Sequence, residues 1–384
     1  MDSTIRSKVL DEFLEISKTT LNTELQQWKA NGGKVIGCFC SYIPEEIITA
    51  AGVVPFRMRA TGSTGTDEAD AYLSQTNCSF CRHCLSMGIR GDFAFLDGAV
   101  WANSCDHVRR IYDNWIRKVE TPFTHIISLP RKTGERQAEW LRDEFADFKD
   151  ALEKQFGLTI SDDDIWKAIQ MHNETRRLQR EVYALRKRED PPITGAETLA
   201  IMVASTAIPR ETYNQLLKQL IDELGQSEGH SEYRARLMII GGVLDDPAYI
   251  EAIESQGALV VTDSLCFGSR TCWVDVDENQ IDPLYAIARY HAIDRPACPR
   301  MHGEQSNRAD FNADMIREFR VDGVIGERII FCDYWSGEHF IINNRLREGG
   351  IPFLKLDREY VLGGVGQLRT RIQAFLETIE GGKS

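Results

Sequence analysis

KVIGCFCSYIPEEIITAAGVVPFRM, residues 34–58, is the stretch that decides the fold. Its first part, Lys34 to Cys40, is apolar and predicts a buried strand. Pro44 to Ala51 predicts a short helix, because proline near a helix start removes an N–H group that has no partner there. Val53 to Met58 predicts a second strand. A helix between two strands forms a βαβ unit, so this stretch predicts a parallel sheet.

The same alternation continues outward along the chain. Further strands are predicted at Gly98 to Asn103, His125 to Leu129, Leu237 to Ile240, Leu259 to Thr262, Gly323 to Phe331 and Pro352 to Leu356. Helices are predicted at Asn77 to Met87, Cys105 to Lys118, Pro247 to Gln256, Asp310 to Phe319, Gly337 to Arg347 and Gly366 to Ile379. Residues 134 to 225 are charged and helical, without a convincing strand.

These patterns predict an α/β fold with two Rossmann-like or flavodoxin-like parallel-sheet domains. We expect an N-terminal helical segment at 1–33, a first α/β domain at 34–133, a central helical insert or linker at 134–230 and a second α/β domain at 231–384.

Composition restricts the classes of function. The chain has 384 residues and a net charge of −13, and no run approaches the roughly 18 apolar residues that span a bilayer. Lysine and arginine form no long basic block, so we expect neither a membrane nor a nucleic acid as partner. Met1 to Lys18 is charged throughout, unlike a secretory signal. We therefore expect a cytoplasmic protein.

Ten cysteines stand at positions 38, 40, 78, 81, 84, 105, 266, 272, 298 and 332. In a cytoplasmic protein such a count indicates metal or redox chemistry, although a single buried cysteine can also act as a small apolar residue. Cys105 and Cys332 each follow a predicted strand, and Cys78 begins a predicted helix. Ligands bind at the carboxyl ends of parallel strands, and helix N-termini stabilise anionic sulfur. These three cysteines could therefore meet in a cleft between the two domains.

The spacing Cys78-x-x-Cys81-x-x-Cys84 admits other interpretations. It resembles part of a ferredoxin motif, but the fourth cysteine is absent; a zinc site would need a second ligand pair. On a helix the three thiols spread over roughly a third of the circumference, so one or two of them should pack in the core. Cys38 and Cys40 are predicted to line the core or cleft, Cys266 and Cys272 to lie in a loop, and Cys298 has no predicted role.

Four blocks in this order resemble the family that contains benzoyl-CoA reductase and the 2-hydroxyacyl-CoA dehydratases. They are SYIPEE at 41–46 leading to AAGVVP at 50–55, NCSFCR at 77–82, SCDH at 104–107, and CD at 332–333 followed by GIP at 350–352 and LKLD at 354–357. The length of the chain and HVRR at 107–110 are most similar to the smaller of the cluster-bearing subunits in ATP-dependent benzoyl-CoA reductases.

The resemblance implies one [4Fe–4S] cluster on Cys78, Cys105 and Cys332, with Cys81 in reserve as the first ligand. It also implies a related subunit with a similar cluster and a separate ATP-hydrolysing activator, with ferredoxin as the upstream electron donor. The chain has no G-x-x-x-x-G-K-[ST] phosphate loop, which fits ATP hydrolysis on another subunit.

The function implied is reduction of benzoyl-CoA to cyclohexa-1,5-diene-1-carbonyl-CoA in anaerobic aromatic degradation. Two alternatives are a subunit of a 2-hydroxyacyl-CoA dehydratase, which forms an enoyl-CoA by radical dehydration, and a non-catalytic electron-transfer or scaffold subunit. Glu45 and Glu46 are candidate proton carriers, although acidic residues also favour a helix start. Asp106 and His107 either hydrogen-bond near the ligands or cap a helix toward solvent.

Overall fold

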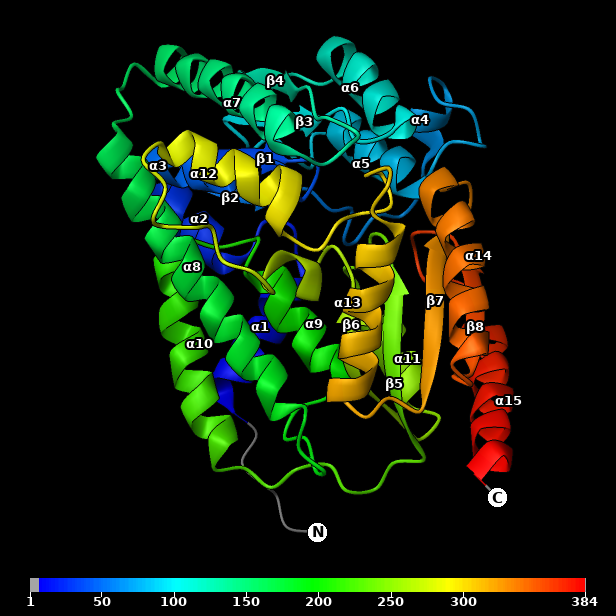
Figure 1. Cartoon of the computed structure of the whole chain (residues 1–384). Coiled ribbons are helices and arrows are strands. Elements are labelled where there is room, and N and C mark those ends of the chain that lie inside the picture. Colours follow the sequence, from blue (N-terminus) through cyan, green and yellow to red (C-terminus); the bar gives the residue numbers. More distant parts are fainter. Residues whose placement is uncertain (1–6, 384) are drawn as a thin grey trace.

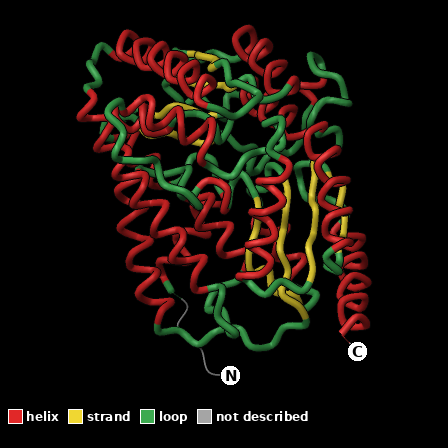
Figure 2. The backbone as a smooth tube through the Cα atoms, in the orientation of Figure 1, coloured by secondary structure: helices red, strands yellow, loops and turns green. Residues whose placement is uncertain are grey.

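A computed structural model describes residues 7–383 and contains two parallel sheets of four strands each. In Figure 1 the first sheet lies above the second, and Figure 2 shows them as separate groups of strands with looped chain between them. The predicted α/β class with two parallel-sheet domains is confirmed. No helix in the described part of the chain combines the length and apolarity that a bilayer crossing requires.

The first sheet has the order β2-β1-β3-β4. Its strands are β1 (Val35–Cys38), β2 (Val54–Arg57), β3 (Gly98–Ala102) and β4 (Thr124–Ile127). The helices of this part are α1 (Lys8–Lys18), α2 (Thr23–Ala30), α3 (Glu45–Ala50), α4 (Asp67–Asp70), α5 (Ser79–Arg90) and α6 (Asp106–Lys118). Strands β1 to β3 are fully buried, as expected for a parallel sheet covered on both faces.

Four helices and no strand follow within the described residues 128 to 234. They are α7 (Glu135–Phe156), α8 (Asp162–Leu185), α9 (Gly195–Ala204) and α10 (Arg210–Gly225). α8 packs against both α10 and α3, whereas α9 packs against α1 and against α11 (Pro247–Glu254) of the second domain. These helices therefore join the two sheet domains through shared packing.

The second sheet repeats the first, with the order β6-β5-β7-β8. Its strands are β5 (Ala235–Gly241), β6 (Ala258–Ser264), β7 (Gly323–Ile329) and β8 (Phe353–Arg358). Its helices are α11 (Pro247–Glu254), α12 (Pro283–Arg289), α13 (Gln305–Glu318), α14 (Asp333–Glu348) and α15 (Val365–Lys383), with a 3₁₀ turn at Ser269–Thr271 and a π-helical turn at Tyr290–Asp294.

One helix start differs from the sequence prediction in a way that concerns the site. The sequence predicts a helix from Gly337 to Arg347. The helix α14 instead begins at Asp333, directly after Cys332, which is its N-cap residue. Trp335 is buried in the first turn and anchors that turn to the core, which outweighs the low helix propensity of Gly337.

The strand orders place the ligand-binding edges of the two sheets. In each sheet the second strand in sequence lies on one side of the first strand, and the third and fourth strands lie on its other side. This is the strand order of flavodoxin-like sheets. Ligands in such sheets bind where the two directions diverge, beyond the carboxyl ends of these central strands. The relevant strands here are β1 and β3 in the first sheet and β5 and β7 in the second.

Candidate functional site

A cavity lies between the two divergence points. Residues that directly follow β1, β3 and β5, together with the end of β7 and the turn after it, line this cavity. Its wall includes the apolar side chains of Phe39, Phe80, Val108, Val243 and Trp335. We call it the cysteine cavity, because seven of its lining residues are cysteines: Cys40, Cys78, Cys81, Cys105, Cys266, Cys298 and Cys332.

The predicted ligand residues all line this cavity, and three of them share one structural position. Cys78, Cys105 and Cys332 are the N-cap residues of α5, α6 and α14. Cys81 lies in the first turn of α5. Three helix N-termini, with their free N–H groups and partial positive charge, therefore begin at this cavity. The role of these thiols as ligands stays a prediction.

The other cysteines divide between the cavity and the core. Cys84 is buried in the core of the first domain, in accordance with the expectation that part of the C-x-x-C-x-x-C motif would pack there. Cys38 and Cys272 are likewise buried in the core, whereas Cys40 and Cys266 reach the cavity. Cys298, which had no predicted role, also lines it.

Burial keeps most of these thiols protonated when no metal is bound. It raises the pKa of Cys105 to about 12 and raises that of Cys332 as well. The pKa of Cys78 is lowered, because it accepts a hydrogen bond from the thiol of Cys81, whose own pKa rises. A metal deprotonates the thiols that coordinate it, so loading this cavity would release protons.

The donor atoms that line the cavity are of a kind that suits an iron–sulfur cluster. Within residues 7–383, no group of three or more His, Cys, Asp or Glu side chains is arranged to hold one metal ion. A [4Fe–4S] cube presents its irons at separate corners, so its thiolates stand farther apart than ligands of one ion. No carboxylate of the described chain lines the cavity, and a set of thiols selects soft centres such as iron–sulfur clusters.

His107 connects the three turns that present these cysteines. It lies two residues after Cys105, and its Nε2 donates to the carbonyl of Phe331, 3.0 Å away. Its Nδ1 is 2.8 Å from Oδ1 of Asn77, the neighbour of Cys78. Of the two roles considered for Asp106 and His107, the structure therefore gives His107 a bonding role beside the cysteines, whereas Asp106 is exposed.

The turn before Cys332 is strained. Phe331 has a φ of 69°, the left-handed region that bulky side chains rarely adopt. Such conformations persist only where surrounding contacts enforce them, and they gather at functional sites. The hydrogen bond from His107 to the Phe331 carbonyl is one such contact.

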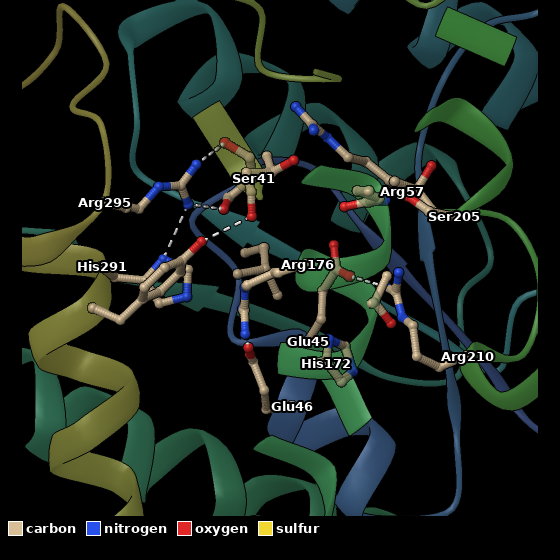
Figure 3. A pocket seen from close by; sticks show the side chains of 16 residues that line it. Ser41, Glu45, Glu46, Arg57, His172, Arg176, Ser205, Arg210, His291 and Arg295 are labelled. Carbon is tan, nitrogen blue, oxygen red and sulfur yellow. Dashed lines mark hydrogen bonds and ion pairs between the residues drawn. The ribbon is translucent and has the colours of Figure 1, made fainter. Parts of the chain in front are cut away.

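Glu45 and Glu46 line a second cavity, the polar cavity, which shares Ser41 and Arg57 with the cysteine cavity (Figure 3). Glu46 is buried and pairs with Arg176. Burial is the largest single influence and would raise the pKa of Glu46, but the charge and hydrogen bond of Arg176, together with His172 and His291, lower it overall, so this carboxylate stays ionised.

Glu45 differs from Glu46 in the direction in which its pKa is shifted. It is 2.5 Å from Arg210, yet burial raises its pKa above the ordinary value. A carboxyl group with a raised pKa exchanges protons nearer to neutral pH, so Glu45 is the better candidate proton carrier. Neither glutamate lines the cysteine cavity itself.

Comparison with known proteins gives one family across most of the chain. The family described as 2-hydroxyglutaryl-CoA dehydratase, D-component, matches residues 40–379. The (R)-phenyllactyl-CoA dehydratase beta subunit of Clostridium sporogenes is 24% identical over 373 residues, covering 97% of this chain and 99% of the relative. The beta subunit of (R)-2-hydroxyglutaryl-CoA dehydratase from Acidaminococcus fermentans is 25% identical over 384 residues, covering 97% and 99%.

A reductase subunit matches to the same degree. This subunit, from the benzoyl-CoA reductase of Thauera aromatica, is 25% identical over 367 residues, covering 93% of this chain and 94% of the relative. The identities to the dehydratase and reductase subunits are therefore alike, at 24–25%.

Proposed function

The chain belongs to the 2-hydroxyglutaryl-CoA dehydratase D-component family, and on that premise we propose that it is the iron–sulfur subunit of a hetero-oligomeric complex that passes single electrons to an acyl-CoA thioester. The observation that supports this most is the meeting of Cys78, Cys105 and Cys332 on one cavity, each at a helix N-terminus. These three thiolates would hold the cluster, with Cys81 in reserve. When bound, the cluster would supply single low-potential electrons and one iron without a protein ligand.

The remaining residues of the site support that chemistry without taking part in electron storage. Phe39, Phe80 and Trp335 keep water away from the cavity. His107 orients the three cysteine turns through the hydrogen bond that its Nε2 donates to the Phe331 carbonyl and the one that its Nδ1 accepts from the N–H of Cys78. The Glu45 carboxyl group holds or releases a proton in the adjoining polar cavity.

The reaction that we propose is reduction of benzoyl-CoA to cyclohexa-1,5-diene-1-carbonyl-CoA. A related cluster-bearing subunit, an ATP-hydrolysing activator and a ferredoxin would act with this chain in the cytoplasm. The second candidate is dehydration of a 2-hydroxyacyl-CoA to an enoyl-CoA, and the identities of 24% and 25% to dehydratase beta subunits support it equally.

Assays of the anaerobically purified complex separate these reactions. The complex, its activator and ATP are incubated with benzoyl-CoA or with (R)-2-hydroxyacyl-CoA esters, and the products are separated by chromatography. We expect the diene from benzoyl-CoA, and loss of turnover in Cys105→Ser but not in the core variant Cys84→Ser. Turnover of the hydroxyacyl esters alone would replace the first candidate by the second. Full turnover by Cys105→Ser would remove both.

A further inference from the structure

The two cavities are lined by an excess of positive charge. Together they present six arginines and two glutamates, in a chain whose net charge is −13. Both glutamates are already paired, Glu46 with Arg176 and Glu45 with Arg210. Burial lowers the pKa of the two histidines of the polar cavity, so they stay neutral and add no charge.

Four arginines therefore remain without a carboxylate, and we call them the arginine collar: Arg57, Arg270, Arg295 and Arg300. None of the four forms an ion pair within 4.0 Å in the described part of the chain. They are 5%, 3%, 5% and 2% exposed. Glu327, whose charge also acts on Arg270, is paired with Arg358 at 2.8 Å.

Neutral groups hold the collar in place. Arg57 donates to Sγ of Cys266, 3.0 Å away, and its guanidinium lies 3.8 Å from the ring centroid of Phe267. Arg295 donates to the carbonyl of Ser41 at 2.6 Å, and Figure 3 shows these two arginines on opposite sides of Ser41. The guanidinium groups of Arg57 and Arg295 are thus fixed in position by groups other than carboxylates.

The other two members face the cysteine cavity with part of their hydrogen-bonding capacity unused. Arg270 donates to the carbonyl of Gly241 at 3.1 Å, and its second Nη has no partner. Arg300 donates to the carbonyl of Leu129 at 3.4 Å, and its Nε has no partner. Arginine stays charged even when buried, so only an anion can balance these groups.

Lack of a carboxylate does not by itself define the collar. Arg59 and Arg236 are also buried without an ion pair, but each donates to at least three backbone carbonyls and lines neither cavity. The collar members differ because Arg57, Arg270 and Arg300 line the cysteine cavity, where we place an anionic group, and Arg295 lines the adjoining polar cavity. A cube held by three thiolates is anionic, and reduction makes its charge more negative by one electron.

We propose that Arg57, Arg270, Arg295 and Arg300 balance the charge of the bound cluster and stabilise its reduced state. The inference rests on the cluster of the proposed function and adds that the collar sets the cluster's reduction potential. In the reduction that concerns the collar, the cube would gain one electron from a low-potential donor. No proton is transferred in that step, and no bond forms or breaks. Fixed positive charge nearby favours the more negative, reduced form.

Potentiometric titration of the full-length protein tests the collar. Iron and acid-labile sulfide are measured first, and dithionite reduction is then followed by EPR. Arg270→Gln and Arg300→Gln should each lower the ratio of reduced to oxidised cluster about tenfold at a fixed potential, a shift of about 59 mV to lower potential. Arg270→Lys, which keeps the charge, should restore most of the shift. Arg186→Gln removes an equally buried charge outside both cavities and should leave the potential unchanged.

The outcomes distinguish failure of the collar proposal from failure of the proposed cluster. A wild-type protein without iron would contradict the proposed function. A fully loaded Arg270→Gln or Arg300→Gln variant with the wild-type potential would overturn the collar alone. If both variants fail to load, the cluster-free proteins decide: at constant ionic strength, the excess of the Tm rise in sulfate over that in chloride should be larger in wild type than in Arg270→Gln, and an equal excess would overturn the collar.

Discussion

Replacing Glu46 by glutamine should destabilise the protein strongly, although the change removes only one charge. Glu46 is 1% exposed, and its partner Arg176 is 7% exposed. In Glu46→Gln the guanidinium keeps its bond to Oδ1 of Asn173 at 2.8 Å and its place 4.5 Å from the ring centroid of Tyr290. Its charge then has no carboxylate. Removing one partner of a buried ion pair costs about 3–5 kcal/mol.

Thermal unfolding followed by circular dichroism measures this loss. At roughly 2 °C per kcal/mol for a chain of this size, Tm should fall by about 6–10 °C. The double variant Glu46→Gln/Arg176→Met should recover much of the loss, because no unpaired charge remains. If Glu46 were only a proton carrier, the single variant would keep the wild-type Tm and lose turnover alone.

The pH dependence follows from the lowered pKa of Glu46. A carboxyl group whose pKa is lower in the folded state stabilises the fold above the pKa of an unfolded glutamate, about 4.3, and this contribution is lost as the pH falls toward the folded pKa. The difference in unfolding free energy between wild type and Glu46→Gln should therefore be constant near neutral pH and shrink below about pH 4. A difference that grows with acidity would refute the assignment.

Three further predictions concern the cysteine turns. Cys81→Ala should retain about four irons per chain by anaerobic iron analysis, whereas a loss would make Cys81 the ligand in place of Cys78. His107→Ala should release iron to a chelator faster, since loss of a bond that supports a ligand lowers metal affinity about 10–100-fold; an unchanged rate would contradict its orienting role. Phe331→Val should be less stable than Phe331→Gly by about 1–2 kcal/mol in urea unfolding, because a β-branched residue disfavours positive φ; equal stability would show that the turn is not strained.

The parts of the fold that depend on local patterns could be predicted from the sequence. The apolar runs around Val35, Val54 and Gly98 form the predicted strands, because burial in a parallel sheet selects continuous apolar residues. The position of Cys105 at a strand-to-helix junction could also be predicted from the sequence, because a strand pattern ends just before it and an amphipathic helix begins just after it.

The parts of the site that depend on distant partners could not be predicted. Glu46 and Arg176 are 130 residues apart in sequence, and no local pattern indicates their pairing. Cys298 lies in an irregular loop that returns to the first domain, where its N–H donates to the Tyr42 hydroxyl at 3.1 Å. A Cβ on Gly241 would collide with the carboxyl group of Glu327, so this glycine is needed for packing against a buried acid from a distant strand.

Anaerobic iron and acid-labile sulfide analysis with EPR, on wild type and on single alanine variants of Cys78, Cys105 and Cys332, tests the central claim most directly. We predict about four irons and a reducible cubane signal in the wild type. We also predict loss of iron in each of the three variants and retention in Cys84→Ala, whose cysteine lies in the core. A colourless wild-type protein, or three variants that keep the wild-type iron content and signal, would contradict it.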